Sequence, residues 1–575
     1  MILPCIPHFR RLSTSASRWQ KLVKPIKTRS YEKDTFFVTT PIYYVNADPH
    51  IGHLYTSLIA DTIVRWQHLQ NKNSKIKFST GTDEHGIKIQ QAASVSNISP
   101  NKYCDKIAAT YKNLAEDFEI NYTSFIRTTD ALHMKTVEKF WNELYSRGNL
   151  YLENYEGWYC VPDETFLTTS QLKEILDKDG KKKFVSEESG HPVEWTKETN
   201  YLFKLSSYQE ELKYWMKTNE NVTPKKFHKI LFDQISKEPL PDISVSRPSS
   251  RVSWGIPVPN DSSQTIYVWL DALVNYLTAA GYANDDANFT HTWPPDFQVI
   301  GKDILKFHGI YWPAFLIAAN LEPPRTLLCH SHWTVSSEKM SKSKQNVVDP
   351  FDRANAYTPE GLRYFLLRSG VTHSDGNYNE DKVIRVLNSE LADTLGNLLN
   401  RCTSESLNPN QEVPKIDAVV LRNLMEKDVT KQFVDNITAL PEICRRHYNE
   451  IKFYRVVDAI IATLHSGNLF FESMKPWELK KNEADHEQLK VVLHITIECL
   501  RVVGILLQPI IPNLSSNILD RINIDINSRC LDDLKIFSWN NDQFVRRDLS
   551  SDKFVLFRRI LLEHRIRKGR RKDCN

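Results

Sequence analysis

The pattern of apolar and polar positions near the amino terminus alternates between strand and helix. Residues 35–45 (TFFVTTPIYYV) are rich in β-branched and aromatic side chains. They precede the segment Asn46-Ala47-Asp48-Pro49, which is rich in turn-forming residues. Apolar residues then recur every three or four positions from Leu54 to Leu69, which is the helical period. A second strand-like run, Ile76–Thr80, leads into the polar turn GTDEHG and another helical pattern. This order predicts an open α/β domain with a parallel sheet.

The alternation stops between about Tyr151 and Pro257. Short aromatic strands, the charged run DKDGKKK and many turn residues replace it there. The α/β pattern resumes at Gln264–Leu270, where we expect a buried strand followed by a helix, and again at Phe297–Ile300 before a helix from Asp303. We therefore predict one sheet that is split by an inserted module.

From about Asn388 onward every strong pattern is helical, which predicts a closing helical bundle. The expected domains are an α/β unit in residues 32–150 and 258–387, an inserted connective module in 151–257, and the bundle in 388–575. The expected bundle helices are Leu391–Cys402, Val419–Gln432, Asn436–Phe453, Val456–Met474 and Ala484–Ile511.

Composition narrows the class of protein. With 41% hydrophobic and 25% charged residues, the chain has enough large apolar side chains to fold, which excludes a disordered or fibrous protein. It has no apolar run near the roughly 18 residues that a membrane span needs, so we expect no membrane partner. Nine cysteines without a C-x-x-C pair exclude a four-cysteine zinc site, and a net charge of +4 leaves nucleic-acid binding open.

Both ends of the chain are basic. Residues 1–31 contain seven Lys or Arg, several hydroxyl residues and no acid, which is typical of a mitochondrial presequence and predicts a location in the mitochondrial matrix. A disordered basic arm that touches RNA is the alternative. The segment Arg558–Lys572 alternates Ile and Leu with Arg and Lys, so its basic face could contact phosphate or be a solvated helix end.

The first candidate motif is Pro49-His50-Ile51-Gly52-His53, between a predicted strand and a predicted helix. Free amides and the positive dipole end of a helix amino terminus favour a phosphate. Gly52 permits close backbone approach, and the imidazoles of His50 and His53 can donate hydrogen bonds to phosphate oxygens. On its own, a pair of histidines in a loop is weak support for a site.

The second candidate motif is the polar run KMSKS after a strand-like stretch. Its cations Lys339 and Lys342 alternate with the hydroxyls of Ser341 and Ser343, which suits a triphosphate that gains charge as pyrophosphate leaves. By itself the run could equally be a solvated, charged loop.

Together the two motifs resemble the paired signatures of class I aminoacyl-tRNA synthetases, which bind ATP from opposite sides of a Rossmann-like fold. Four further blocks, TTPIYYVNADPHIGHLYT, STGTDEHG, YVWLDALVNYL and IGKDILKFHGIYWPAFL, are similar to the methionyl-tRNA synthetase family. The resemblance covers most of the chain from Phe36 to about Trp477. It implies an ATP-dependent ligase that joins methionine to tRNA(Met), here for mitochondrial translation.

The resemblance also implies a methionine pocket. Aromatic and apolar walls suit a polarizable thioether, and the Asp83 carboxylate suits the substrate ammonium. The family often has proline where this chain has Leu273, which puts that part of the wall in question. Without the resemblance, Trp269 and Trp312 would be assigned to the core. The matching positions are Ile42, Tyr44, Asp83, Trp269, Ala272, Leu273, Tyr276, His308 and Trp312.

The chemistry implied by the resemblance is an in-line attack of the methionine carboxylate on the α-phosphorus of ATP, followed by transfer to the 2′-hydroxyl of the terminal adenosine of tRNA. Catalysis would come from positioning and charge stabilisation by His50, His53, Lys339 and Lys342 with Mg²⁺. His53 and Lys342 are expected to matter most. The predicted ATP-binding set is His50, Gly52, His53, Lys339, Ser341, Lys342 and Ser343.

The inserted module departs from the family at its zinc knuckle. Cys160 remains, but Asp163, Ser186 and Ser189 stand where further ligands would be expected. One thiolate with two hydroxyls cannot make a tetrahedral structural zinc site, so we expect a metal-free knuckle held by packing. Farther on, Arg247 either braces the junction of module and sheet or contacts substrate.

For tRNA, the resemblance implies that Asn397, Arg401, Asn468 and Trp477 receive the anticodon CAU, with the Trp ring stacked on an unpaired base. Asn397 and Arg401 are one helical turn apart, and the alternative is that both only pack within a helix. No added oligonucleotide-binding domain follows the bundle, so a monomer is expected.

Two rival functions share features of this sequence. The cysteine-specific synthetase would need a cluster of thiol-selecting zinc ligands, and the sequence has no such cysteine cluster. A relative turned into a non-catalytic RNA-binding or splicing factor is argued against by the intact His50, His53, Lys339 and Lys342.

Overall fold

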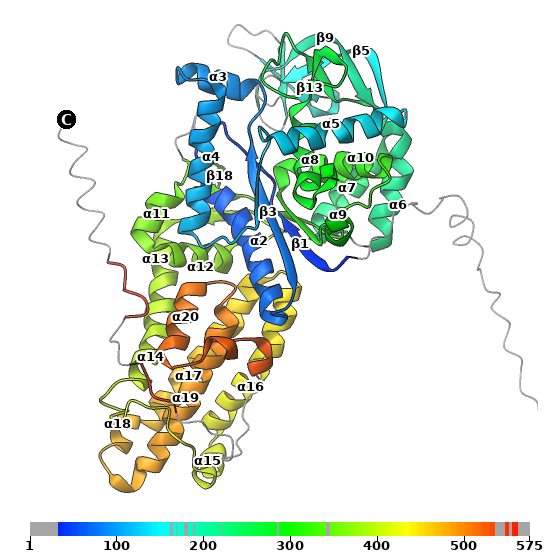
Figure 1. Ribbon diagram of the computed structural model, residues 1–575. Coiled ribbons are helices and arrows are strands. Elements are labelled where there is room, and N and C mark those ends of the chain that lie inside the picture. The colour runs from blue at the N-terminus through cyan, green and yellow to red at the C-terminus, as the bar shows by residue number, and fades with distance from the viewer. Residues whose placement is uncertain are drawn as a thin grey trace, which may run out of the picture.

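The computed structural model describes residues 33–160, 165–167, 169–176, 182–187, 190–219, 221–284, 287–340, 346–534, 547–550 and 555–561. The predicted presequence, residues 1–31, lies outside these ranges, as does most of the basic segment Arg558–Lys572. An α/β unit fills the upper half of Figure 1, and the helices of residues 397–521 form the lower half. No helix in the described ranges is long and apolar enough to cross a membrane.

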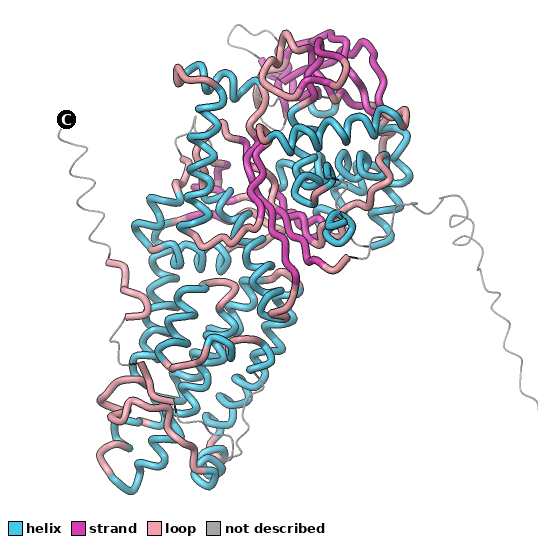
Figure 2. The backbone as a smooth tube through the Cα atoms, viewed as in Figure 1, coloured by secondary structure: helices cyan, strands magenta, loops and turns pink. Residues whose placement is uncertain are grey.

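A parallel sheet lies at the centre of the α/β unit and appears as the magenta layer between helices in Figure 2. In the described part of the chain its order is β10-β16-β15-β1-β3-β2, and β4 also pairs with β3. Every pairing in this sheet is parallel, which confirms the predicted Rossmann-like fold class. Its strands are β1 (Thr35–Thr39), β2 (Tyr43–Tyr44), β3 (Lys75–Asp83), β4 (Ser124–Arg127), β10 (Val222–Thr223), β15 (Phe297–Gly301) and β16 (Leu327–His330).

Both faces of this sheet are buried. Neighbouring residues Phe37 and Val38 on β1 are both inaccessible and point to opposite faces, as a strand requires. Val38 packs in the same cluster as helix α2 (Ile51–Gln70), whereas Phe37 packs with α5 (Ala131–Ser146) and α8 (Val268–Ala280). Other helices of this unit are α3 (Ile87–Val95), α4 (Pro100–Asp117), α10 (Trp312–Ala318), α11 (Pro350–Tyr357) and α12 (Pro359–Ser369).

Residues 151–257 contain the short strands expected from the sequence, and they also contain two helices that were not expected, α6 (Gln209–Asn219) and α7 (Lys225–Lys237). Strands β11 (Ile243–Ser244), β9 (Glu194–Phe203), β5 (Leu150–Cys160) and β6 (Thr165–Leu167) form one sheet, beside the hairpin of β7 (Leu172–Leu176) and β8 (Lys182–Ser186). The short strand β10 comes from the same stretch of sequence but pairs with β16 in the central sheet.

The strand expected at Gln264–Leu270 as part of the parallel sheet ends earlier and belongs to another sheet. Strand β14 (Asp261–Ile266) belongs to a small antiparallel sheet with β12 (Ser246–Pro248) and β13 (Pro257–Val258), and α8 already begins at Val268. After β14, the next strand of the parallel sheet is β15. A short apolar run does not distinguish a strand from the buried start of a helix, which explains the error.

The bundle is helical, as predicted, but several helix boundaries differ; the helix predicted to end at Phe453 ends at Asn449, and the next helix begins at Phe453. Helix α15 (Ala418–Met425) ends early, and α16 (Asp428–Asn449) runs without a break through the predicted gap between Gln432 and Asn436. The chain turns instead at Lys427, whose backbone is extended. Neither Gly nor Pro marks this turn. The remaining main helices are α13 (Glu380–Val386), the π-helical segment Leu387–Gly396, α14 (Asn397–Cys402), α17 (Phe453–Met474), α19 (His486–Leu507) and α20 (Pro512–Arg521).

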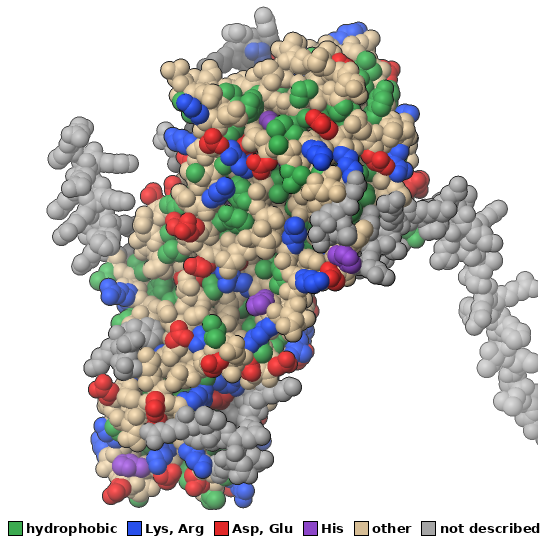
Figure 3. All heavy atoms as spheres, in the orientation of Figure 1, with side chains coloured by type: hydrophobic (Ala, Val, Ile, Leu, Met, Phe, Trp, Pro, Cys, Tyr) green, Lys and Arg blue, Asp and Glu red, His purple; other side chains and the backbone are tan. Residues whose placement is uncertain are grey.

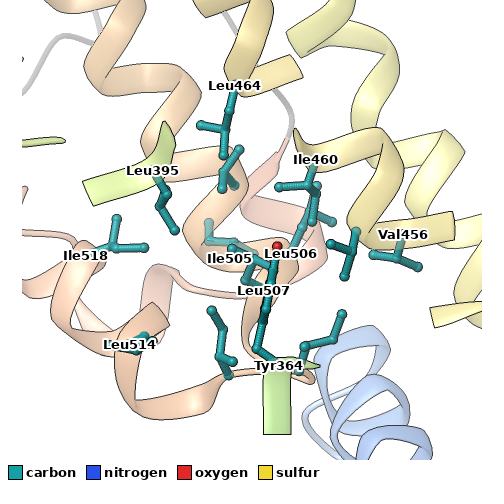
Figure 4. Packing of buried hydrophobic residues seen from close by; sticks show 14 of the residues in the cluster. Tyr364, Leu395, Val456, Ile460, Leu464, Ile505, Leu506, Leu507, Leu514 and Ile518 are labelled. Atoms are coloured by element: carbon teal, nitrogen blue, oxygen red, sulfur yellow. The ribbon is translucent and has the colours of Figure 1, made fainter. Parts of the chain in front are cut away.

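The bundle core is built by side chains from several of these helices. Leu395 of the π-helical segment, Leu464 of α17 and Ile505 of α19 converge in Figure 4, and all are buried. Tyr364 of α12 lies at the edge of the same cluster. The α/β unit and the bundle therefore share one continuous apolar core.

Helix α2 also joins the two halves through polar groups. Asp61 accepts a hydrogen bond from Arg363 at 2.7 Å, and both side chains are inaccessible to solvent. Arg363 also donates to the carbonyl oxygens of Phe118 and Ile510. Near the end of α2, the ring of Trp66 stacks on Tyr448 of α16 at 4.3 Å. Removing one partner of such a buried pair typically costs about 3–5 kcal/mol, so α2 is firmly held against the bundle.

Candidate active site

The first turn of α2 fixes the two motif histidines. The backbone N–H of Gly52 donates to Nδ1 of His50 at 3.0 Å, and the backbone N–H of His50 donates to Nδ1 of His53 at 3.3 Å. The two rings stack with centroids 3.8 Å apart. Because each Nδ1 accepts a backbone N–H, each neutral imidazole carries its own proton on Nε2.

Burial keeps these imidazoles uncharged. It lowers the pKa of His50 to about 4 and that of His53 well below its ordinary value, and the nearby His50 lowers the latter further. At neutral pH both side chains therefore act as neutral hydrogen-bond donors. Positive potential at this end of the cavity comes from the amino terminus of α2.

The second motif reaches the same place. Strands β17 (Trp333–Val335) and β18 (Glu338–Lys339) form a hairpin that ends at the KMSKS run. Lys339 and Met340 line one cavity of about 380 Å³ together with His50, Gly52 and His53. The backbone N–H of Ile51 also donates to the Val348 carbonyl at 3.1 Å, which joins the chain after the run to α2. Ser341, Lys342 and Ser343 lie outside the described residues.

The same cavity contains most of the predicted methionine-binding residues. Asp83 lies at the end of β3, and Trp269, Ala272, Leu273 and Tyr276 come from α8. The other predicted residues in the lining are Ile42, Tyr44 and His308. Leu273 belongs to an uninterrupted helix and contributes its side chain to the wall.

Trp312 is not among the lining residues. It is fully buried, and its ring lies 5.9 Å from that of Tyr276 and 5.9 Å from that of Phe140. Trp312 therefore supports the cavity wall from behind.

A tyrosine–histidine pair closes the apolar end. Nδ1–H of His308 donates to the Ile304 carbonyl at 2.9 Å, which leaves Nε2 free of a proton to accept the Tyr276 hydroxyl at 2.7 Å. Burial lowers the pKa of His308 to about 4 and raises that of Tyr276, so both groups are neutral. This end of the cavity can therefore bind an uncharged, polarizable group.

Several lining residues were not singled out from the sequence. Asp303 and His332 both line the cavity, with 3.3 Å between Nε2 of His332 and Oδ1 of Asp303. Loss of hydration would raise the pKa of Asp303, but the hydrogen bond and charge of His332 and the charge of Lys339 hold it below its ordinary range. Its position after β15 was the available signal, because ligands bind at the carboxyl ends of parallel strands.

Arg247 lies away from the cavity lining, at the junction between module and sheet. Its guanidinium lies 3.9 Å from the ring centroid of Tyr159 and donates to Glu198 at 2.9 Å, and it is almost fully buried. These contacts fit the bracing role.

The region of the knuckle is packed by aromatic rings. Trp158 contacts Phe184 and Trp195, with centroids 5.0 and 5.4 Å apart, and Cys160 is buried at the end of β5. Ser186 ends β8, whereas Asp163 and Ser189 lie outside the described residues. Within the described ranges, no group of three His, Cys, Asp or Glu side chains is placed to hold a metal ion.

The predicted anticodon residues lie on the bundle. The Arg401 guanidinium is 4.8 Å from the ring centroid of Phe471 and 5.6 Å from that of Trp477, and it pairs with Glu472 at 2.7 Å. Trp477 is 36% exposed, enough to offer a ring face. Asn397 is also exposed at the start of α14.

Asn468, the fourth predicted anticodon residue, makes hydrogen bonds within the bundle. Its amide group donates to the carbonyl oxygens of Thr394 and Leu464, which ties α17 to the π-helical segment. This arrangement gives its amide donors a structural use.

Comparisons with known proteins agree with this geometry. The family model described as "tRNA synthetases class I (M)" matches residues 36–403, and "Anticodon binding domain of methionyl tRNA ligase" matches 424–538. The mitochondrial methionine–tRNA ligase of Homo sapiens is 46% identical over 538 residues, covering 91% of this chain and 90% of that protein. The probable mitochondrial enzyme of Dictyostelium discoideum is 42% identical over 509 residues, covering 87% of this chain and 88% of that protein.

A solved structure is also similar. The methionyl-tRNA synthetase of Mycobacterium tuberculosis in complex with methionyl-adenylate superimposes with a TM-score of 0.84 at 34% identity, covering 91% of this chain and 99% of that one. The parallel sheet and the cavity shared by both signature motifs define a class I aminoacyl-tRNA synthetase. Within that class, the chain belongs to the methionyl-tRNA synthetase family. The predicted family, fold and ligase activity are confirmed.

Gly52 offers a test of the histidine arrangement. A Cβ at this position would lie 2.8 Å from Cε1 and 2.9 Å from Nδ1 of His50, too close for the ring to stay in place. We expect Gly52→Ala to displace the His50 imidazole and to lower kcat/KM for ATP by about a hundredfold in pyrophosphate exchange, the size typical of losing one transition-state donor. Gly361→Ala, where the nearest atoms are at 3.2 Å or more, is the control. Equal activity of the two variants would contradict the arrangement.

Proposed function

We propose that the cavity binds methionine and ATP side by side and that its two ends have separate tasks. The Asp83 carboxylate binds the methionine ammonium, and the wall of Trp269, Leu273 and Tyr276 receives the thioether. The triphosphate lies between the imidazoles of His50 and His53 and the lysines of the KMSKS run. The observation that carries this proposal is that His50, His53, Asp83 and Lys339 line the same cavity.

The first step then needs no general base. A carboxylate oxygen of methionine attacks the α-phosphorus, the new C–O–P link forms, and the α–β phosphoanhydride bond breaks to release pyrophosphate. The electron pair of the broken bond leaves on pyrophosphate. Nε2–H of His50 and His53 stabilises the growing charge by hydrogen bonding, and Lys339 and Lys342 stabilise it electrostatically. Neutral imidazoles can donate in this way without gaining or losing a proton.

We propose Mg²⁺ as the cation that accompanies ATP. A hard cation needs oxygen ligands, and the half-exposed, ionised carboxylate of Asp303 supplies one in the cavity. When bound, the ion would neutralise phosphate charge. Pyrophosphate exchange that survives complete chelation of divalent cations would contradict this.

In the second step, we propose that the 2′-hydroxyl of the terminal adenosine attacks the acyl carbon of methionyl-adenylate, which gives methionyl-tRNA(Met) and AMP. Recognition of the CAU anticodon is assigned to the surface that Trp477, Asn397 and the partly buried Arg401 form. The packing of Arg401 against Phe471 and Trp477 supports this, because it prepares an aromatic and cationic surface for an unpaired base.

We further propose a monomer of the mitochondrial matrix whose knuckle lacks zinc. The curated relatives are named as mitochondrial enzymes, and the first thirty-one residues have presequence composition. The aromatic packing around Trp158 supports a knuckle that needs no ion. On the face shown in Figure 3, acidic and basic side chains are interspersed among apolar ones. Fractionation of tagged protein tests the location in the mitochondrial matrix. Sedimentation tests the monomer, and metal analysis of purified protein tests the absence of zinc from the knuckle.

The activity is tested by pyrophosphate exchange with each of the twenty amino acids in turn. We expect exchange to depend on methionine. Exchange driven by cysteine would favour the rival synthetase, and no exchange with any amino acid would favour a non-catalytic RNA-binding factor.

Lys342 is expected to act mainly in the transition state. We expect Lys342→Ala to slow adenylate formation by about a hundredfold or more while methionine binding changes little, because the cation is needed as pyrophosphate leaves. Lys344→Ala, one residue beyond the KMSKS run, is the matched control and should keep most activity. Single-turnover adenylate formation and equilibrium methionine binding separate the two effects. A wild-type rate in Lys342→Ala would refute the role.

Trp477 is expected to act only on tRNA. Trp477→Ala should raise the KM for tRNA by about tenfold or more, since a stacked base contributes about 1–3 kcal/mol. Pyrophosphate exchange should be unchanged, and Trp477→Phe, which keeps a ring, should recover part of the loss. If Trp477→Ala lowered both reactions equally, an anticodon role would be untenable.

A further inference from the structure

Behind the methionine end of the cavity lies a buried chain of polar side chains. Nδ1 of His85 is 2.7 Å from Oδ2 of Asp271, and Nε2 of His133 is 2.7 Å from Oδ1 of the same carboxylate. Nδ1 of His133 is 2.9 Å from the hydroxyl of Thr278. His85 is 4% exposed, Asp271 1% and His133 0%. A carboxylate only accepts hydrogen bonds, so each imidazole must present an N–H to Asp271.

None of these three residues is in the cavity lining, but two lie within two positions of a lining residue in the sequence. His85 follows Asp83 by two positions in the turn after β3. Asp271 lies between Trp269 and Ala272 on α8, and successive helical residues point about 100° apart, so Asp271 faces α5 and β3 while Ala272 faces the cavity. The chain therefore joins the turn that carries Asp83 to the helix that carries the thioether wall.

The rest of that turn is held separately. Arg127 donates to both oxygens of Glu84, at 2.7 and 3.0 Å, and the indole N–H of Trp254 donates to the Glu84 carbonyl at 2.6 Å. These contacts fix the turn to β4 and to the loop between β12 and β13, near the end of the inserted module. The contact of His85 with Asp271 fixes it instead to α8.

A buried ionised group adds little to the free energy of unfolding, because its removal from water is unfavourable. Removing a carboxylate from water costs several kcal/mol, and well-packed apolar residues in the same space often give equal or greater stability. A fully satisfied polar network instead specifies one geometry. Both oxygens of the Asp271 carboxylate accept a hydrogen bond from a histidine. Burial by itself would raise the pKa of Asp271, but His85 and His133 lower it by more, so the pKa lies below its ordinary value.

We infer that His85, Asp271 and His133 are positioning residues that set the spacing between the Asp83 carboxylate and the thioether wall, and thereby the affinity for methionine. This inference rests on the proposed binding of the substrate ammonium by Asp83. The ATP end of the cavity is fixed by other contacts, those of the first turn of α2 and of Val348. The chain should therefore affect methionine and leave ATP largely unaffected.

The test compares two substitutions of His85. Alanine removes the link, whereas asparagine places an amide N–H near the position of Nδ1 and can restore it. We expect His85→Ala to raise the KM for methionine in pyrophosphate exchange by about tenfold or more, with the KM for ATP changed less than about twofold. His85→Asn should recover most of the affinity. Asp271→Asn puts an amide donor opposite an imidazole donor, so it should also raise the KM for methionine and leave the KM for ATP nearly unchanged. This variant replaces His85→Ala in the test if His85→Ala does not fold.

Two results would overturn the inference. Folded variants with unchanged KM for methionine would show that the spacing does not depend on the chain. An equal rise in the KM for both substrates would show general support of the fold. Asp83→Asn, measured in parallel, separates the two proposals: if it leaves the KM for methionine unchanged, the ammonium site is wrong, whereas if it alone raises that KM, only the positioning role fails.

Discussion

Helix α2 is the part of the molecule on which the active site and the bundle both depend. Its first turn holds His50 and His53 at the phosphate end of the cavity, and its later turns carry Asp61 and Trp66 into contact with α12 and α16. A helix of 20 residues spans about 30 Å, so one rigid element connects the two regions. The buried pair of Asp61 and Arg363 makes that connection costly to break. Helix α2 therefore extends from the catalytic cavity to the bundle, as Figure 1 shows.

The charge of the lining side chains differs between the parts of the cavity that we assign to the two substrates. The thioether end is lined by aromatic rings and by a tyrosine–histidine pair that burial keeps neutral. The ammonium end has the carboxylate of Asp83, and the phosphate end combines neutral imidazole donors with Lys339. Methionine carries an ammonium and an uncharged thioether at opposite ends, so only one orientation matches both ends. In the binding mode that we propose, this orientation directs the methionine carboxylate toward the nucleotide.

Much of the fold followed from local patterns in the sequence. Runs of β-branched and aromatic residues and segments with a helical period indicated the α/β order, and α2 was visible because apolar residues recur regularly from Leu54 to Leu69. Boundaries without Gly or Pro were not visible, as the turn at Lys427 shows. The buried segment around Ile266 was also ambiguous, because its apolar residues serve a strand and then a helix without a polar gap.

The site could be predicted where a motif defined it and not where only tertiary packing does. His50, His53 and Lys339 are far apart in sequence yet line one cavity, as the paired motifs implied. The supporting position of Trp312 and the backbone contacts of Asn468 depend on neighbours that no local pattern reveals. Asp303 was missed because a single acid after a strand is not distinctive until the strand is known to be central.

The most direct test of this account is a crystal structure of the full chain with methionine and a non-hydrolysable ATP analogue. The account predicts that phosphate oxygens lie within hydrogen-bonding distance of Nε2 of His50 and His53, with the KMSKS run closed over them from the opposite side and the methionine ammonium at Asp83. A nucleotide bound elsewhere, with either motif out of reach of its phosphates, would contradict the central claim.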